Sequence, residues 1–116
     1  MPSERPARRL QDIIENAKAI LAYTTGMDLA AFKEDRKTYD AVERCLERIN
    51  ESAAKLGDQA AELMPERPWH TIRALGNRLR HEYDAIREDR LWDIVQVDLP
   101  SLCAACEEAL RRLRDG

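Results

Sequence analysis

Residues 67–81 are the most positively charged stretch of this 116-residue chain. They contain four arginines, both histidines and no acidic residue, although the whole chain has a formal net charge of −3. On a helix, Arg73, Asn77 and His81 would recur every four residues along one face. That face would combine a planar donor fork for a phosphate, an amide and an imidazole that titrates near neutral pH. The set suits cleavage of a phosphodiester without a metal.

The same residues also have an ordinary structural interpretation. Arginine and asparagine on a helix usually form a solvated face, and a histidine beside an apolar stripe often only donates a hydrogen bond. Tyr83 suits a partly buried packing residue with a hydrated hydroxyl. Spacing alone therefore leaves both catalysis and packing open.

The composition favours an all-α protein. Charged residues make up 35% and aromatic residues 5% of the chain, with only 4 Gly and 5 Pro. We predict one domain over residues 1–116, because this length suits a single core.

The N-terminus does not resemble a signal peptide and no apolar run reaches membrane-spanning length, so we expect no membrane association and a cytoplasmic location.

Apolar residues recur at helical spacing along most of the chain, which predicts a compact antiparallel bundle of three to four long helices plus short helices. Asp28 is expected to cap a short helical turn, and Gly57 is expected to end a long helix. Asp98 and Pro100 predict a fresh helix start. The predicted helical stretches are residues 6–24, 29–32, 35–56, 58–65, 68–86, 91–95 and 99–113.

Cys103 and Cys106 have the C-x-x-C spacing of some metal sites. A zinc site needs about four ligands, and the sequence has no second pair. Both cysteines fall on the apolar stripe of the last helix, where a free cysteine packs as a small hydrophobic residue. We therefore expect core packing, and no metal or other cofactor.

Charged residues near both ends of the chain have simpler interpretations. The spacing predicts i,i+4 ion pairs of Glu107 with Arg111 and of Glu108 with Arg112. The three arginines within residues 5–9 could widen a nucleic-acid surface, or could simply form a solvated first helical turn.

The order of the residues after the positive stretch carries a family resemblance. Residues 77–84 read Asn-Arg-Leu-Arg-His-Glu-Tyr-Asp, residues 91–95 read Leu-Trp-Asp-Ile-Val, and residues 98–102 read Asp-Leu-Pro-Ser-Leu. In this order they resemble the HepT-like family of the HEPN superfamily. The likeness covers nearly the whole chain, including the Pro68-Trp69 helix start.

The resemblance implies a HEPN-like fold, a two-fold homodimer and a metal-independent endoribonuclease. It also implies that the protein is the toxin of a bacterial or archaeal toxin–antitoxin pair. The implied partner is an MntA-like nucleotidyltransferase antitoxin that transfers AMP to a tyrosine. By position, His81 matches the family histidine, Tyr83 the modified tyrosine and Asn77 the polar residue before the histidine.

One position departs from the family pattern. The motif arginine usually stands where this chain has Gly76. Arg73 is one turn earlier, about 12 Å along a helix from His81, and Arg80 is later in the sequence. Across a two-fold interface, Arg73, Arg78 or Arg80 of the second subunit could approach the histidine, or the arginine is lost and most activity with it. If the chemistry survives, Arg73, or Arg80 as a substitute, would hold the scissile phosphate.

Gly76 therefore leaves three functions open. The first is an active ribonuclease toxin, with His81 as general acid or base and Asn77 as an orienting group. The second is a catalytically weakened HEPN dimer that acts as a nucleotide- or nucleotidyltransferase-binding module. The third is a plain helical adaptor, which would make the positive stretch accidental.

Overall fold

The computed structural model describes residues 5–57, 59–63 and 88–115. Every regular element within these residues is a helix, which confirms the all-α fold class. The helices are α1 (Pro6–Tyr23), α2 (Leu29–Glu34), α3 (Arg36–Leu56), α4 (Gln59–Leu63), α6 (Glu88–Asp93), the π-helix η2 (Ile94–Asp98) and α7 (Leu99–Asp115).

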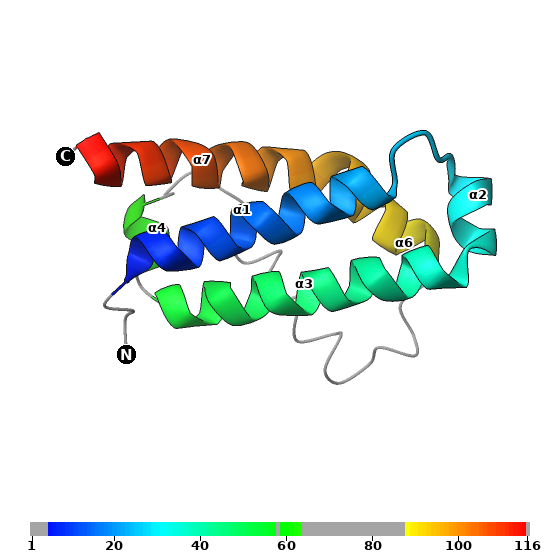
Figure 1. Ribbon diagram of the computed structural model, residues 1–116, viewed down its shortest axis with the longest axis horizontal. Helices are drawn as coiled ribbons and strands as arrows, with labels where there is room; N and C mark the ends of the chain where they lie inside the picture. Colours follow the sequence, from blue (N-terminus) through cyan, green and yellow to red (C-terminus); the bar gives the residue numbers. More distant parts are fainter. Residues whose placement is uncertain (1–4, 58, 64–87, 116) are drawn as a thin grey trace.

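Three long helices form the body of the molecule, which measures 45 × 30 × 21 Å along its principal axes. Helix α1 packs against both α3 and α7 and runs antiparallel to each of them (Figure 1). Helices α3 and α7 therefore run in the same direction. Helix α4 lies at the end of the bundle where α3 finishes, whereas α6 lies at the other end, beside α2 (Figure 1).

Local rules set the helix boundaries that the sequence predicts. A carboxylate oxygen of Asp28 accepts the Ala31 N–H at 2.8 Å, which caps α2. Asp35 caps α3 in the same way through the Thr38 N–H at 3.0 Å, and this hydrogen bond lowers the pKa of the Asp35 carboxyl. Helix α3 ends at Gly57, whose φ of 56° is readily adopted only by glycine.

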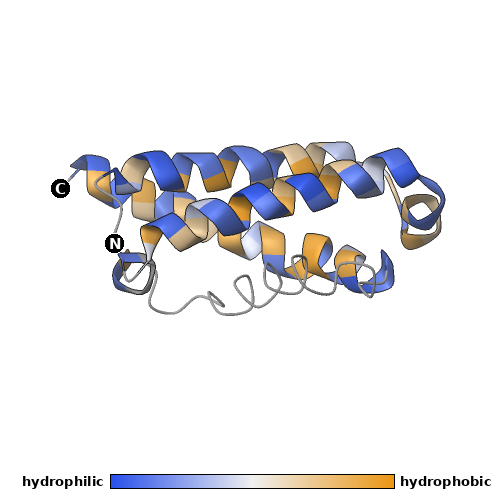
Figure 2. Ribbon diagram, turned by 90° about the horizontal axis from the view of Figure 1, so that it is seen from below, coloured by the Kyte–Doolittle hydropathy of each residue, from blue (hydrophilic) through white to orange (hydrophobic). Residues whose placement is uncertain are grey.

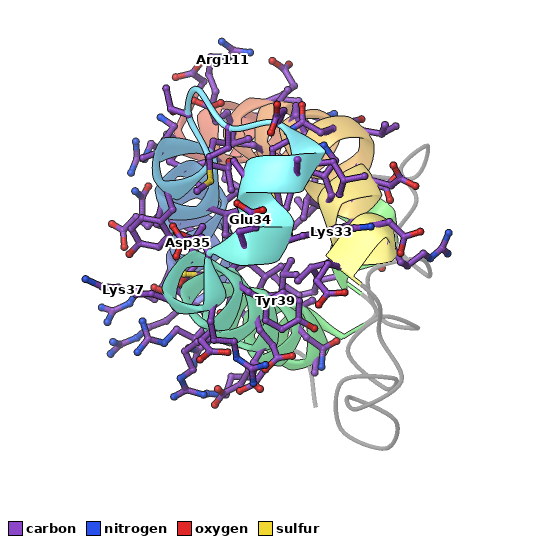
Figure 3. All side chains as sticks on the ribbon, turned by 90° about the vertical axis from the view of Figure 1, so that its right-hand side faces the viewer. Lys33, Glu34, Asp35, Lys37, Tyr39 and Arg111 are labelled. Carbon is purple, nitrogen blue, oxygen red and sulfur yellow. The ribbon has the colours of Figure 1, made fainter. Side chains whose placement is uncertain are left out.

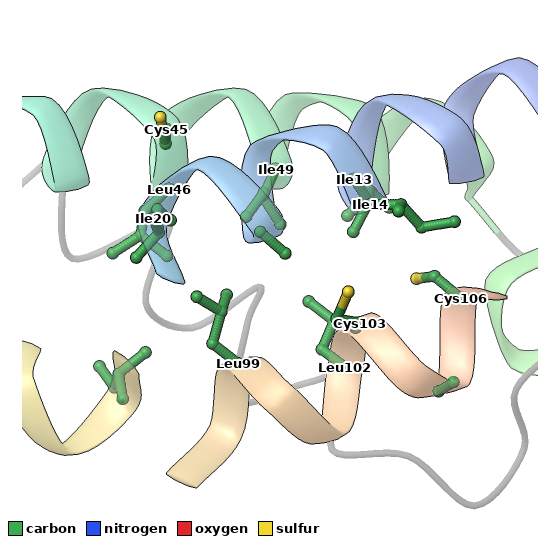
Figure 4. Close-up of a cluster of buried hydrophobic side chains, with 14 of the residues drawn as sticks. Ile13, Ile14, Ile20, Cys45, Leu46, Ile49, Leu99, Leu102, Cys103 and Cys106 are labelled. Carbon is green, nitrogen blue, oxygen red and sulfur yellow. The ribbon is translucent and has the colours of Figure 1, made fainter. Parts of the chain in front are cut away.

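The core consists of apolar side chains from the facing stripes of the long helices (Figure 4). Each long helix is amphipathic, with hydrophilic and hydrophobic residues on different sides (Figure 2). The predicted stripes are confirmed for α1 and α3, where Ile13, Ile20 and Ile49 are fully buried. Burial of each such side chain contributes roughly 1.5–3 kcal/mol to folding. Leu113 is an exception among the leucines of α7, because it is 38% exposed near the helix end.

Helix α7 begins at Leu99, where Asp98 and Pro100 predict a helix start, but no break in the helical path precedes it. Helices α6, η2 and α7 follow one another without a gap, and the path widens into a π turn at Ile94–Asp98. The Leu99 N–H bonds the carbonyl of Ile94, five residues back. Pro100 has no N–H, and in an α-helix its ring would clash with the carbonyl four residues earlier. A wider turn before Pro100 relieves that clash, so the proline perturbs the helix without ending it.

Candidate functional site

The residues that the sequence predicts for chemistry lie between α4 and α6, within residues 64–87. The segment is outside the described residues, so the geometry of its side chains stays a prediction. These residues are Arg73, Gly76, Asn77, Arg80, His81 and Tyr83. The described residues do show how the chain is held on either side of the segment.

The chain enters the segment from a well-anchored residue. The guanidinium of Arg112, on α7, donates a hydrogen bond from Nη2 to the carbonyl oxygen of Leu63 at 2.8 Å. Leu63 is the last residue of α4 and is partly buried against the core. A cation at this position satisfies a carbonyl at the helix end and interacts favourably with the negative end of the helix dipole.

This contact corrects the ion pairs expected on α7. Arg112 bonds a backbone carbonyl 49 residues away in the sequence and not Glu108. Glu108 pairs with Arg111 at i,i+3 spacing, and Glu107 pairs with Lys18 of α1 at 3.4 Å. Contacts between helices therefore take precedence over the i,i+4 pairs within α7.

The chain leaves the segment through α6, which is anchored by an aromatic cluster. The ring centroid of Phe32, on α2, lies 5.2 Å from the ring centroid of Trp92 on α6 and 5.9 Å from that of Tyr39 on α3. Both pairs are tilted, a favourable arrangement for aromatic rings. Phe32 is fully buried, so the cluster joins three helices at the end of the bundle where α6 begins.

The two anchors lie at opposite ends of the bundle (Figure 1). A helix over residues 68–86, as the sequence predicts, would be about 28 Å long at 1.5 Å per residue. Residues 68–86 lie outside the described residues, so the third long helix stays a prediction.

The start of α6 also lies near a group of interacting titratable residues. Burial raises the pKa of the Tyr39 hydroxyl, and the negative charges of Glu43 and Glu88 raise it further. Burial raises the pKa of the Glu43 carboxyl too, with further contributions from Glu47 and Asp40. This set is dominated by carboxylates, which repel the phosphates of a nucleic acid. It therefore fits an RNA cleavage site poorly.

Sequence reasoning missed the interaction of Tyr39 with Glu43. The i,i+4 spacing of the two residues on α3 was the only sequence signal for it. The contribution of Glu88 could not have been found in this way, because it comes from another helix 49 positions after Tyr39.

None of the three cysteines forms a disulfide and all three are buried, which confirms that Cys103 and Cys106 belong to the core (Figure 4). Burial raises the pKa of the Cys106 thiol to about 12. The Cys103 thiol lies 3.7 Å from a carboxylate oxygen of Glu107, and burial raises its pKa as well. Raised pKa values keep these sulfurs as unreactive thiols. Within residues 5–57, 59–63 and 88–115, no three His, Cys, Asp or Glu side chains cluster as they would around a metal ion.

Comparison with known proteins identifies the family. The family described as "Ribonuclease HepT-like" matches residues 13–109, which is most of the chain and includes the positive stretch. The chain belongs to the HepT-like ribonuclease family. No solved structure matches the fold of this HepT-like protein significantly.

Relatives of this HepT-like protein carry ribonuclease names. A Methanocaldococcus jannaschii protein named as a candidate RNase is 34% identical over 111 residues, which cover 96% of this chain and 92% of the relative. A Thermococcus cleftensis protein named "Probable ribonuclease HepT" is 34% identical over 93 residues, covering 80% and 84% of the two chains. A Caldanaerobacter subterraneus protein, also named as a candidate RNase, is 24% identical over 107 residues, covering 92% and 96%.

The described helices of this HepT-like protein also bear on membrane insertion. Among them, none combines the length and the apolar character that a bilayer-spanning helix requires.

Proposed function

We propose that this HepT-like protein is the ribonuclease toxin of a toxin–antitoxin pair and cleaves RNA without a metal ion. The observation that carries the proposal is the family match over residues 13–109, which contains the Asn77–Tyr83 motif. The ribonuclease names of relatives that align over most of the chain support it.

The proposed reaction is an internal transfer at the scissile phosphate. His81 acts as general base and takes the proton of the ribose 2′-hydroxyl, and the 2′-oxygen then attacks the phosphorus. The bond to the 5′-oxygen breaks, and that oxygen receives a proton from a general acid. The products are a 2′,3′-cyclic phosphate end and a free 5′-hydroxyl. Arg73 or Arg80 stabilises the charge that develops on the phosphate, and Asn77 orients it.

We propose that the active species is a two-fold homodimer, in which the histidine-bearing segments of the two subunits share one cleft. Because Gly76 replaces the motif arginine, another arginine must approach His81. A dimer would allow that arginine to come from either subunit. Light scattering of the purified protein should give twice the mass of one chain. A monomer at micromolar concentration would contradict this part of the proposal.

Cleavage is tested with the purified full chain and a labelled RNA in the presence of a chelator. The wild type should cleave the RNA, whereas His81→Ala should lose at least 100-fold in rate, because general acid–base catalysis contributes about that much. His70→Ala is the matched control, since it removes the only other histidine. Equal cleavage by the wild type and His81→Ala would refute the catalytic assignment.

We propose that a partner nucleotidyltransferase neutralises the toxin by transferring AMP from ATP to the Tyr83 hydroxyl, with release of pyrophosphate. Radiolabelled AMP should appear on the wild type and on Tyr23→Phe, but not on Tyr83→Phe. Tyr23 is a suitable control because its side chain is 49% exposed and accessible to an enzyme. If Tyr83→Phe were labelled as strongly as the wild type, the AMP would be attached to another residue and the assignment to Tyr83 would be refuted.

The alternative function is a binding module with little or no cleavage, and Gly76 is the observation that favours it. Gly76→Arg restores the residue that the family pattern has at this position. If the natural chain is a weakened enzyme, this variant should cleave RNA much faster than the wild type. If another arginine already serves the site, the rate should not rise.

A further inference from the structure

One end of the bundle gathers arginines from both ends of the chain. Helix α1 begins and helix α7 ends at this end of the bundle, and the two helices pack against each other along their length (Figure 1). Residues 5–12 and 108–115 together contain six arginines, no lysine and three acidic residues. We call this surface the arginine end, and its arginines are Arg5, Arg8, Arg9, Arg111, Arg112 and Arg114. Nearby, Lys55 pairs with Glu51 at 3.4 Å and Glu62 adds one negative charge.

The acidic residues at the arginine end neutralise only part of its charge. Arg8 and Arg9 approach the same carboxylate, that of Asp12, at 3.7 and 3.8 Å. One carboxylate can offset only one of these two positive charges. Arg111 has a partner in Glu108, whereas the bond from Arg112 goes to a neutral carbonyl, which offsets less of its charge than a carboxylate would.

The side chains at this end are also accessible. Arg8 is 67% exposed and Arg111 is 65% exposed, and Arg114 also lies on the surface. The first turn of α1 contains no acidic residue, but the positive end of its helix dipole is opposed by the negative ends of α3 and α7, which finish at the same end of the bundle, so the positive field comes from the arginine side chains. The surface can therefore attract an anion and contact it directly.

The opposite end of the bundle is acidic. Residues 28–43 and 88–98 contain nine acidic and four basic residues. Figure 3 looks onto this end, where Glu34 and Asp35 mark the junction of α2 and α3. The charge of the described residues is thus polarised along the long axis of the molecule, and a polyanion would be attracted to one end and repelled by the other.

We propose that the arginine end is a second RNA-binding surface, which holds phosphates of a long RNA away from the scissile bond. The inference rests on the proposed function for the identity of the polyanion. Arginine, and not lysine, supplies this charge, and its planar fork matches a phosphate group through two hydrogen bonds. Arginines on two adjacent helices contact phosphates along the backbone and need not read the bases.

The test is the salt dependence of RNA binding, measured by fluorescence anisotropy in the His81→Ala background so that the RNA stays intact. The test variant is Arg8→Gln/Arg111→Gln/Arg114→Gln, which leaves the Arg112 anchor of α4 in place. The matched control is Lys33→Gln/Lys37→Gln/Arg90→Gln, which removes the same charge from exposed residues at the acidic end.

The plot of log affinity against log salt concentration should become shallower by about 2 in the test variant, since each lost phosphate contact contributes about 0.7 for a single strand. The control variant should keep the wild-type slope. Equal slopes in all three proteins would overturn the proposal, and so would equal losses in test and control, which would reflect net charge alone. Tighter binding of polyglutamate than of RNA would overturn it in favour of an acidic protein partner.

Two further measurements keep the result unambiguous. Circular dichroism melting should show that the test variant is folded. If the triple variant does not fold, the single variant Arg114→Gln replaces it and should reduce the slope by about 0.7. Cleavage by the wild type is measured in parallel. If the test variant keeps the wild-type slope while cleavage still depends on His81, only the RNA-binding role of the arginine end is refuted. If the wild type and His81→Ala cleave RNA equally, only the proposed function is refuted.

Discussion

Phe32 is the residue whose removal should most weaken the end of the bundle where α6 begins. Its side chain is fully buried and its ring contacts those of Trp92 and Tyr39 at 5.2 and 5.9 Å. Truncation of a buried phenylalanine to alanine costs about 3–5 kcal/mol, because the cavity collapses only partly. For a domain with a total stability of about 5–15 kcal/mol, Phe32→Ala should be severely destabilised.

Phe32→Leu separates the loss of volume from the loss of ring contacts. Leucine keeps most of the buried volume but makes no aromatic pair, and each such pair is worth about 0.5–1.5 kcal/mol. We therefore expect a loss of about 1–2 kcal/mol for Phe32→Leu.

The assay is urea denaturation followed by circular dichroism, at one protein concentration because dimerisation would make the stability concentration-dependent. Tyr23→Ala is the control, and its half-exposed ring should contribute less than about 0.5 kcal/mol. If Phe32→Ala costs less than about 1 kcal/mol, the ring does not hold α2, α3 and α6 together and the packing argument is refuted.

Three further predictions concern other parts of the molecule. The pKa of Glu43 is raised from 4.5 in the folded state, so its ionisation opposes folding and the stability of the protein falls as the pH rises through the raised pKa. Glu43→Gln should therefore unfold at a higher urea concentration than the wild type at pH 7. The difference between the two proteins should vanish below pH 4.5. The Cys106 thiol, with its pKa of about 12 and no exposed surface, should not react with a thiol reagent at pH 8 until urea unfolds the chain, as mass spectrometry of the labelled peptide would show. Arg112→Ala should accelerate amide hydrogen exchange in Gln59–Leu63 because the capping hydrogen bond is lost, whereas Arg111→Ala should not, and equal rates in both would contradict the anchoring role.

Most helix boundaries among the described residues could be predicted from the sequence because they depend on neighbouring residues. Asp28 and Asp35 cap their helices through backbone N–H groups three positions ahead, and Gly57 ends α3 through its own backbone conformation. The apolar stripes follow from helical periodicity in the same way.

The contacts that join separate helices could not be predicted, because they depend on tertiary packing. Nothing in the sequence near Arg112 indicates that it reaches the Leu63 carbonyl, and the local rule for ion pairs suggested Glu108. The π turn before Pro100 was missed for a related reason. A proline near an aspartate usually marks a helix start, whereas here the π turn accommodates Pro100 and the helical path continues into α7, which packs against α1.

For the candidate site, sequence reasoning supplied residue types, and the family match supports the resemblance from which their roles were inferred. His81 and Tyr83 could be singled out because of their order relative to the residues that follow. The arginine that serves the phosphate could not be chosen, since Gly76 stands in its usual place and the substitutes differ in distance along the helix. In the proposed homodimer that choice would depend on the approach of a second subunit, which no local pattern encodes.

The π turn at Ile94–Asp98 has a consequence for how the family can vary. It holds one more residue than an α turn would, so it behaves as a one-residue insertion within a continuous helical path. Deleting one residue there to give a regular α turn would rotate everything after it by about 100°. Leu99 and Leu102 would then turn away from α1, while α6 kept its contact with Phe32. Length changes in this family should therefore be far rarer at this turn than in the surface connection between α1 and α2.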